Sequence, residues 1–146
     1  MSNQTTLILF KPDAVQKNVV GECLARFQRE NFSIRGIKMM QLDEPILREH
    51  YEHIIDLVID GTPIFPRLLK YMSGGPVIAL ALSGENAILR VRELIGPTNS
   101  KNAPAGTIRG DFGVDSSVNV CHASDSEENA NIELHRFFKQ EELFLA

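Results

Sequence analysis

The chain has 146 residues, of which 43% are hydrophobic, and a formal net charge of −4. This length and apolar content predict one globular domain over residues 1–146 with a sizeable core. The mildly acidic balance argues against a broad nucleic-acid-binding face, but a metal and local donors could still hold a polyphosphate. No apolar run approaches a membrane span, and the polar start Met1–Thr6 does not fit a signal peptide.

The cysteine content bears on the compartment. Cys23 and Cys121 are the only two cysteines of the sequence. A pair in a domain of this size does not make a disulfide framework, so we expect a cytoplasmic location. Both cysteines fit small buried hydrophobes better than redox groups.

The first half of the chain alternates strand-like and helix-like patterns. We expect a strand over about 5–10, a helix over about 20–30 and a second strand over 33–42. A helix opened by Pro45 and carrying apolar residues as far as Ile59 is predicted next, stopped by a glycine and a proline. A short helix over about 65–72 follows.

The second half repeats the alternation. It predicts a strand over 77–82 and then a helix that Asn86 caps. Periodicity disappears over 96–117, and a loop of that length is usually functional or disordered. Val118, Val120 and Cys121 suit a buried strand, and the last helix carries Ala130, Leu134, Phe137 and Phe138 on one face. Two strand–helix–strand halves predict an α+β sandwich in which helices cover an antiparallel four-stranded sheet.

A histidine stands between that last strand and the last helix. The sequence there is Asn119-Val120-Cys121-His122-Ala123-Ser124-Asp125, followed by Ser126. Ser124 and Ser126 each suit a helix cap, and Ser124 with Glu127 fits a capping box. Free N–H groups at a helix start favour anions, so His122 fits a nucleophile that accepts a phosphoryl group. A lone histidine at a strand end is more often structural.

Two further segments favour the phosphate interpretation. The first strand ends in Lys11-Pro12-Asp13, and Gly106–Phe112 contains Arg109. Each segment places one cation in a turn-rich setting, as a phosphate site requires.

Together these motifs resemble the nucleoside diphosphate kinase family, from Leu7 to about Leu143. The resemblance implies a ferredoxin-like fold with a long inserted loop. It also implies transfer of the γ-phosphoryl group from a nucleoside triphosphate to a nucleoside diphosphate, in a ping-pong scheme with phosphohistidine on His122. Mg²⁺ would be held mainly by the substrate phosphates, and the protein would be a homo-oligomer built from dimers, either a tetramer or a hexamer.

The resemblance also implies roles for individual residues. His122 would be the nucleophile and Glu133 the carboxylate that orients its ring, with Ser124 beside them; on the residues alone, Glu133 would be a solvated helix charge. The remaining site residues implied are the phosphate-binding Lys11, Arg92 and Arg109, the polar contacts Thr98 and Asn119, and Tyr51, which packs near the histidine.

One segment departs from the family pattern. The family stacks the nucleobase on an aromatic ring, but Thr62-Pro63-Ile64-Phe65 places Ile64 at that position. The segment between Tyr51 and Lys70 is also longer than is usual in the family. Either Phe65 turns inward or the base rests on an aliphatic surface.

Three alternatives remain. His50 and His53 are three residues apart and could suggest a metal pair, although a solvated helix face is favoured. The chain could be a non-catalytic nucleotide-binding regulatory module, but its intact set of motif residues argues against this. Nucleic-acid binding as the main role is disfavoured by the acidic charge.

Overall fold

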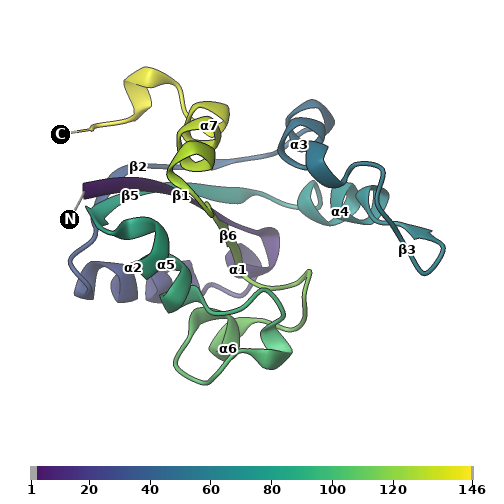
Figure 1. Cartoon of the computed structure of the whole chain (residues 1–146), viewed down its shortest axis with the longest axis horizontal. Coiled ribbons are helices and arrows are strands. Elements are labelled where there is room, and N and C mark those ends of the chain that lie inside the picture. The colour runs from purple at the N-terminus through teal and green to yellow at the C-terminus, as the bar shows by residue number, and fades with distance from the viewer. Residues whose placement is uncertain (1–2, 146) are drawn as a thin grey trace.

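The computed structural model describes residues 3–145 and has a central sheet with helices on both sides (Figure 1). Short 3₁₀ helices lie at Glu52–Ile54, Ser100–Asn102 and Gln140–Glu142. The strands are β1 (Asn3–Phe10), β2 (Ser33–Met40), β3 (Val58–Ile59), β4 (Thr62–Pro63), β5 (Val77–Glu85) and β6 (Cys121–Ala123). The helices are α1 (Pro12–Gln16), α2 (Val20–Arg29), α3 (Glu44–His50), α4 (Phe65–Met72), α5 (Ala87–Ile95), α6 (Ile108–Phe112) and α7 (Glu127–Phe137).

The main sheet has the order β2-β5-β1-β6, and all its pairs are antiparallel. Side chains alternate between its two faces, so Ile8 and Leu80 contribute to one core while Leu9 and Ala79 contribute to the other. The first core packs against α2 and α5, and the second against α3, α4 and α7. The predicted α+β sandwich with a ferredoxin-like sheet is therefore confirmed.

The sheet brings Lys11 and His122, which are far apart in the sequence, close together. The β1 strand is central, and its last residues pair with β6, so Leu9 lies opposite His122. Lys11 follows β1 directly, and α7 crosses the same strand (Figure 1). The nucleophile candidate and the lysine candidate therefore lie near the same end of the paired strands β1 and β6.

The helix expected from Pro45 to Ile59 is wrong in its second half. The α3 helix ends at His50, and Val58–Ile59 pairs with Thr62–Pro63 as a hairpin, β3–β4. Its two-residue turn is Asp60-Gly61, and both residues have positive φ, 50° and 75°. This is the backbone that an Asp-Gly hairpin turn requires, and the turn overrides the helical spacing of the apolar residues.

The final strand is also shorter than predicted. Val120 has a φ of 76° and stands outside β6, which begins at Cys121. A positive φ breaks the extended path that its β-branched side chain would favour.

Two of the predicted caps are wrong. Asn86 has φ 51° and makes no side-chain cap; Gln4 instead accepts the N–H of Ile88 at 3.0 Å. The cap of α7 is Ser126, which accepts from Asn129 N at 3.0 Å, so the capping box of Ser124 with Glu127 does not form.

The long inserted loop over 96–117 is not confirmed as such. It contains the 3₁₀ helix Ser100–Asn102 and the helix α6, and Ile108 is fully buried. Thr107 caps α6 by accepting from Gly110 N at 3.0 Å.

Cys23 and Cys121 are free and fully buried, as predicted. No helix within residues 3–145 has the length and apolar character that a membrane crossing requires. Of the polar start Met1–Thr6, the first two residues lie outside the described part.

Candidate active site

A cleft of about 930 Å³ opens where β1 ends and β6 begins, between the α3–α4 region and α7. One wall comes from residues 49–68, and the opposite wall comes from the segments around Lys11, Arg109 and His122. The structure thus brings the predicted site residues together, and all of them line the cleft except Ser124. Those lining it are Lys11, Tyr51, Ile64, Arg92, Thr98, Arg109, Asn119, His122 and Glu133.

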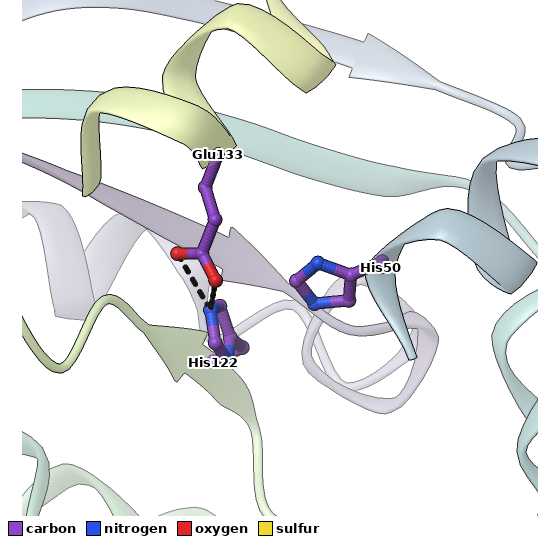
Figure 2. A group of neighbouring side chains, drawn as sticks. All are labelled: His50, His122 and Glu133. Carbon is purple, nitrogen blue, oxygen red and sulfur yellow. Dashed lines mark hydrogen bonds and ion pairs between the residues drawn. The ribbon is translucent and has the colours of Figure 1, made fainter. Parts of the chain in front are cut away.

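His122 is held by a carboxylate from α7, as Figure 2 shows. Its Nε2 lies 3.0 Å from both carboxylate oxygens of Glu133. Ser124, which is 1% exposed, donates its hydroxyl to Glu133 Oε1 at 2.6 Å and accepts the N–H of Leu7 at 3.3 Å. The helix carboxylate is therefore tied to the central strand through Ser124.

This arrangement fixes the tautomer of His122. Burial raises the pKa of Glu133, but the hydrogen bond and charge of His122, together with the Ser124 hydroxyl, bring that pKa below its usual value. An ionised carboxylate only accepts hydrogen bonds, so Nε2 carries the proton and Nδ1 keeps a free lone pair. His122 is 29% exposed in its side chain and is thus accessible from the cleft.

His50 lies against His122, and the expected solvated helix face is wrong for this residue. It is 6% exposed, and the two rings meet edge to face at 4.8 Å between centroids (Figure 2). Burial first, and then neighbouring His122, lower the pKa of His50 to about 3, so the ring is neutral. Arg136 Nη1 donates to His50 Nδ1 at 2.8 Å, and only His53 is exposed as predicted.

Lys11 and Arg109 form the cationic side of the cleft. Lys11 Nζ donates to Asn119 Oδ1 at 2.8 Å, and burial followed by the charge of Arg109 lowers its pKa to about 8. Arg109 donates to three main-chain carbonyls: Asn119 at 3.2 Å, Gly96 at 3.0 Å and Cys121 at 2.7 Å. Arg109 therefore fastens the backbone on both sides of Val120 besides charging the cleft.

The other predicted polar residues lie around this pair. Arg92 is exposed on α5 and donates to the carbonyl of Ala123 at 3.2 Å. Asn119 is 2% exposed and donates to the carbonyl of Thr98 at 2.9 Å. The Tyr51 ring meets the His50 ring edge to face, with 4.9 Å between centroids, and thus lies one ring away from His122.

A strained turn precedes the nucleophile, and the sequence interpretation missed it. The N–H of Cys121 donates to the carbonyl of Asn119 at 2.9 Å, which closes a γ-turn around Val120 at φ 76°. This form of γ-turn is rare, and a residue held in such a region costs about 1–3 kcal/mol. Valine is among the residues least suited to it, so no local signal announces the turn.

The far wall of the cleft is aliphatic. Leu57, Ile59 and Leu68 line it together with Ile64. Phe65 is 5% exposed and packs in the second core, with the Arg48 guanidinium 5.3 Å from its ring centre. Of the two alternatives left by the sequence, Phe65 turns away from the cleft and Ile64 faces it.

Known proteins resemble nearly the whole chain. A sequence profile described as nucleoside diphosphate kinase matches residues 4–143. The nucleoside diphosphate kinase of Sulfurisphaera tokodaii is 43% identical over 143 residues, which are 98% of this chain and 94% of that protein. The enzyme of Saccharomyces cerevisiae is 40% identical over 146 residues, covering 98% and 92%.

Solved structures agree with these relatives. The Aquifex aeolicus nucleoside diphosphate kinase superposes with a TM-score of 0.90 at 41% identity, covering 97% of this chain and 99% of that one. A halophilic nucleoside diphosphate kinase from Halobacterium salinarum, solved in complex with CDP, gives 0.90 at 33% identity, covering 99% and 93%. The chain therefore belongs to the nucleoside diphosphate kinase family.

Proposed function

We propose that this enzyme transfers the γ-phosphoryl group of a nucleoside triphosphate to a nucleoside diphosphate through phosphohistidine on His122. The observation that carries this is the bond from His122 Nε2 to Glu133 at 3.0 Å, because it leaves Nδ1 as the nucleophile in the cleft. A purely regulatory nucleotide-binding module is not favoured, because it has no need of an oriented imidazole.

The proposed transfer consists of two successive displacements at the γ-phosphorus. The Nδ1 lone pair attacks the γ-phosphorus; the N–P bond forms, and the bond to the β-bridging oxygen breaks, with its electron pair leaving on the diphosphate. The terminal oxygen of a second nucleoside diphosphate then attacks the same phosphorus and displaces Nδ1. Through both steps Nε2 keeps its proton, and Glu133 stabilises the charged ring.

The other residues neutralise and position the phosphates. Lys11, Arg92 and Arg109 converge on the cleft and would bind phosphate oxygens. Thr98 and Asn119 would contact sugar or phosphate groups, and Tyr51 would pack near the reaction. Their shared location in one cleft supports this assignment.

Mg²⁺ is the divalent cation we propose. Within residues 3–145, one group of three or more potential ligands was found: His50, His122 and Glu133, whose atoms lie within 4.8 Å of one another. Glu133 is already bound to His122, and the Arg136 cation donates to His50, so this group does not suit a resident metal. The cleft fits a cation that arrives on substrate phosphates and retains water, as Mg²⁺ does, which would neutralise phosphate charge.

We expect kcat/KM to fall as the pH rises through about 8, the pKa to which burial lowers Lys11 from 10.5. Below that pH Lys11 is a cation and attracts phosphate; above it the charge is lost, so the decline approaches tenfold per pH unit. An unfolded lysine keeps its proton to higher pH, so deprotonation of Lys11 in the folded chain adds stability between about 8 and 10.5 rather than removing it.

The measurement is a pH profile of kcat/KM, with thermal unfolding followed at each pH. In Lys11→Arg the guanidinium stays charged, and the decline above pH 8 should disappear. A wild-type profile that stays flat well above pH 8 would contradict the role of Lys11.

We expect weak discrimination among bases, because Ile64 offers apolar contact and no hydrogen bond to a base edge. Ile64→Phe should lower KM about fivefold for purine and pyrimidine diphosphates alike, since base–aromatic stacking is worth about 1–3 kcal/mol and isoleucine already recovers part of it.

The matched control is Val58→Phe, which adds a ring on the neighbouring β3–β4 hairpin, at a residue that is 54% exposed and does not line the cleft. An unchanged KM in Ile64→Phe would mean that Ile64 does not contact the base.

We further propose one domain over residues 1–146, a cytoplasmic location and a homo-oligomer built from dimers, either a tetramer or a hexamer. Free, buried thiols support the location. The edge strand β2 supports the assembly, because Ile37 and Met39 are 48% and 58% exposed on it.

A further inference from the structure

Several hydrogen bonds from other parts of the chain hold the γ-turn at Val120, besides the one that closes the turn. Its carbonyl accepts the N–H of Lys11 at 2.8 Å, and its N–H donates to Asp13 Oδ2 at 3.1 Å. Arg109 holds the two neighbouring carbonyls, those of Asn119 and Cys121. Strained backbone persists only where its surroundings over-determine it, and such places cluster at functional sites.

Asp13 is the one carboxylate in this set. It is 6% exposed and does not line the cleft. Its Oδ1 accepts a hydrogen bond from the hydroxyl of Tyr71, which belongs to α4. The carboxylate thus joins α1, α4 and the turn before β6, and it has no access to a substrate.

The turn determines where His122 lies. His122 lies two positions after Val120, with only Cys121 between them, and β6 is only three residues long, with its register set by Leu9 opposite His122. If Val120 relaxed to an extended φ, the peptide groups on either side of it would rotate and the start of β6 would shift. His122 would then leave the position at which Glu133 accepts the hydrogen bond from its Nε2–H.

We propose that Asp13, supported by Tyr71, is a positioning residue that holds Val120 in the γ-turn and thereby aims His122 at the phosphoryl group. This inference rests on the proposed phosphohistidine function. It assigns Asp13 no contact with nucleotide, so the effect should appear in the chemical step and not in substrate binding.

Asp13→Ala should lower kcat about 100-fold, the scale on which a 1 Å misplacement acts, and leave KM within about threefold. Asp13→Asn should recover most of the rate, because its amide oxygen still accepts from Val120 N–H. Tyr71→Phe removes one of the two partners of the carboxylate and should give an intermediate loss. A KM that rises as much as kcat falls would overturn the proposal.

A second substitution separates positioning from plain stability. Glycine adopts a positive φ without penalty, so Val120→Gly in the Asp13→Ala background should raise kcat at least severalfold. Two merely destabilising changes would instead add and lower activity further. A double variant slower than Asp13→Ala overturns the proposal.

Asp43→Ala is the matched control, since Asp43 also accepts one backbone N–H, that of Ile46 at 3.1 Å. Asp43→Ala should reduce the free energy of unfolding and leave kcat unchanged.

If Asp13→Ala does not fold, Tyr71→Phe and Asp13→Asn carry the test. Hydrogen exchange of the Val120 and Cys121 amides should then be faster in Tyr71→Phe than in wild type. If both the exchange and the rate of Tyr71→Phe are unchanged, the proposal is overturned. A wild-type enzyme that forms no phosphohistidine would refute the proposed function, a failure distinct from that of Asp13.

Discussion

His122→Ala should abolish phosphoryl transfer and leave the fold intact. Glu133 binds Nε2 of His122, so the lone pair of Nδ1 stays free to attack the phosphorus. Loss of this nitrogen removes the covalent route, and the rate should fall by several orders of magnitude. The direct measurement is incubation with γ-labelled ATP: wild type should acquire acid-labile, alkali-stable label, and the variant none. Transfer from ATP to a second diphosphate gives the steady-state rate.

The control for this experiment is His135→Ala. His135 is exposed on α7 and makes its contact with the carbonyl of Asn131 at 2.8 Å, away from the cleft. This variant should label and turn over like wild type. Activity above a few per cent in His122→Ala, with a folded protein, would refute the nucleophile assignment.

Glu133→Ala should lower the rate of phosphohistidine formation by about 10²–10³-fold, because the ring loses both its orientation and its counter-charge. Glu133→Gln should lower this rate less, because its amide oxygen still accepts the hydrogen bond from Nε2. The rate should stay below that of wild type, because the negative charge is gone. Nucleotide KM should change little in both variants. Single-turnover labelling separates the chemical step from binding.

Glu128→Ala is the control on the same helix, since Glu128 is exposed in the first turn of α7. Its rate should equal that of wild type. Equal rates for wild type and Glu133→Ala would show that the tautomer of His122 is set by another group, with neighbouring His50 the first to examine.

The local pattern of apolar and polar residues predicts most of the strands of the sheet and the helices that cover it. Strands such as β5 carry continuous apolar runs because both faces of the sheet are buried. The same pattern gave a wrong prediction over α3–β3, where the apolar residues have helical spacing but the Asp60-Gly61 turn forms a hairpin. Here a two-residue turn outweighs periodicity.

The candidate site likewise has a part that the sequence predicts and a part that it does not. Motif resemblance provided the residues that line the cleft, including Glu133, which spacing alone would have left in solvent. What it could not provide are arrangements made by distant parts of the chain. His50 is buried because Arg136 and Phe137 reach it from α7, and Val120 takes a positive φ because Asp13 and Lys11 hold it.

The aliphatic wall of the cleft is one continuous stretch between β2 and β5, whereas the reactive wall is assembled from both ends of the chain. The proposed base contact and the proposed phosphoryl chemistry thus belong to separate portions of the sequence, and ring contact between His50 and His122 joins the two. Exchange of residues 52–68 with the corresponding stretch of a relative is accordingly the graft through which nucleotide preference could be redesigned while the catalytic scaffold stays as it is.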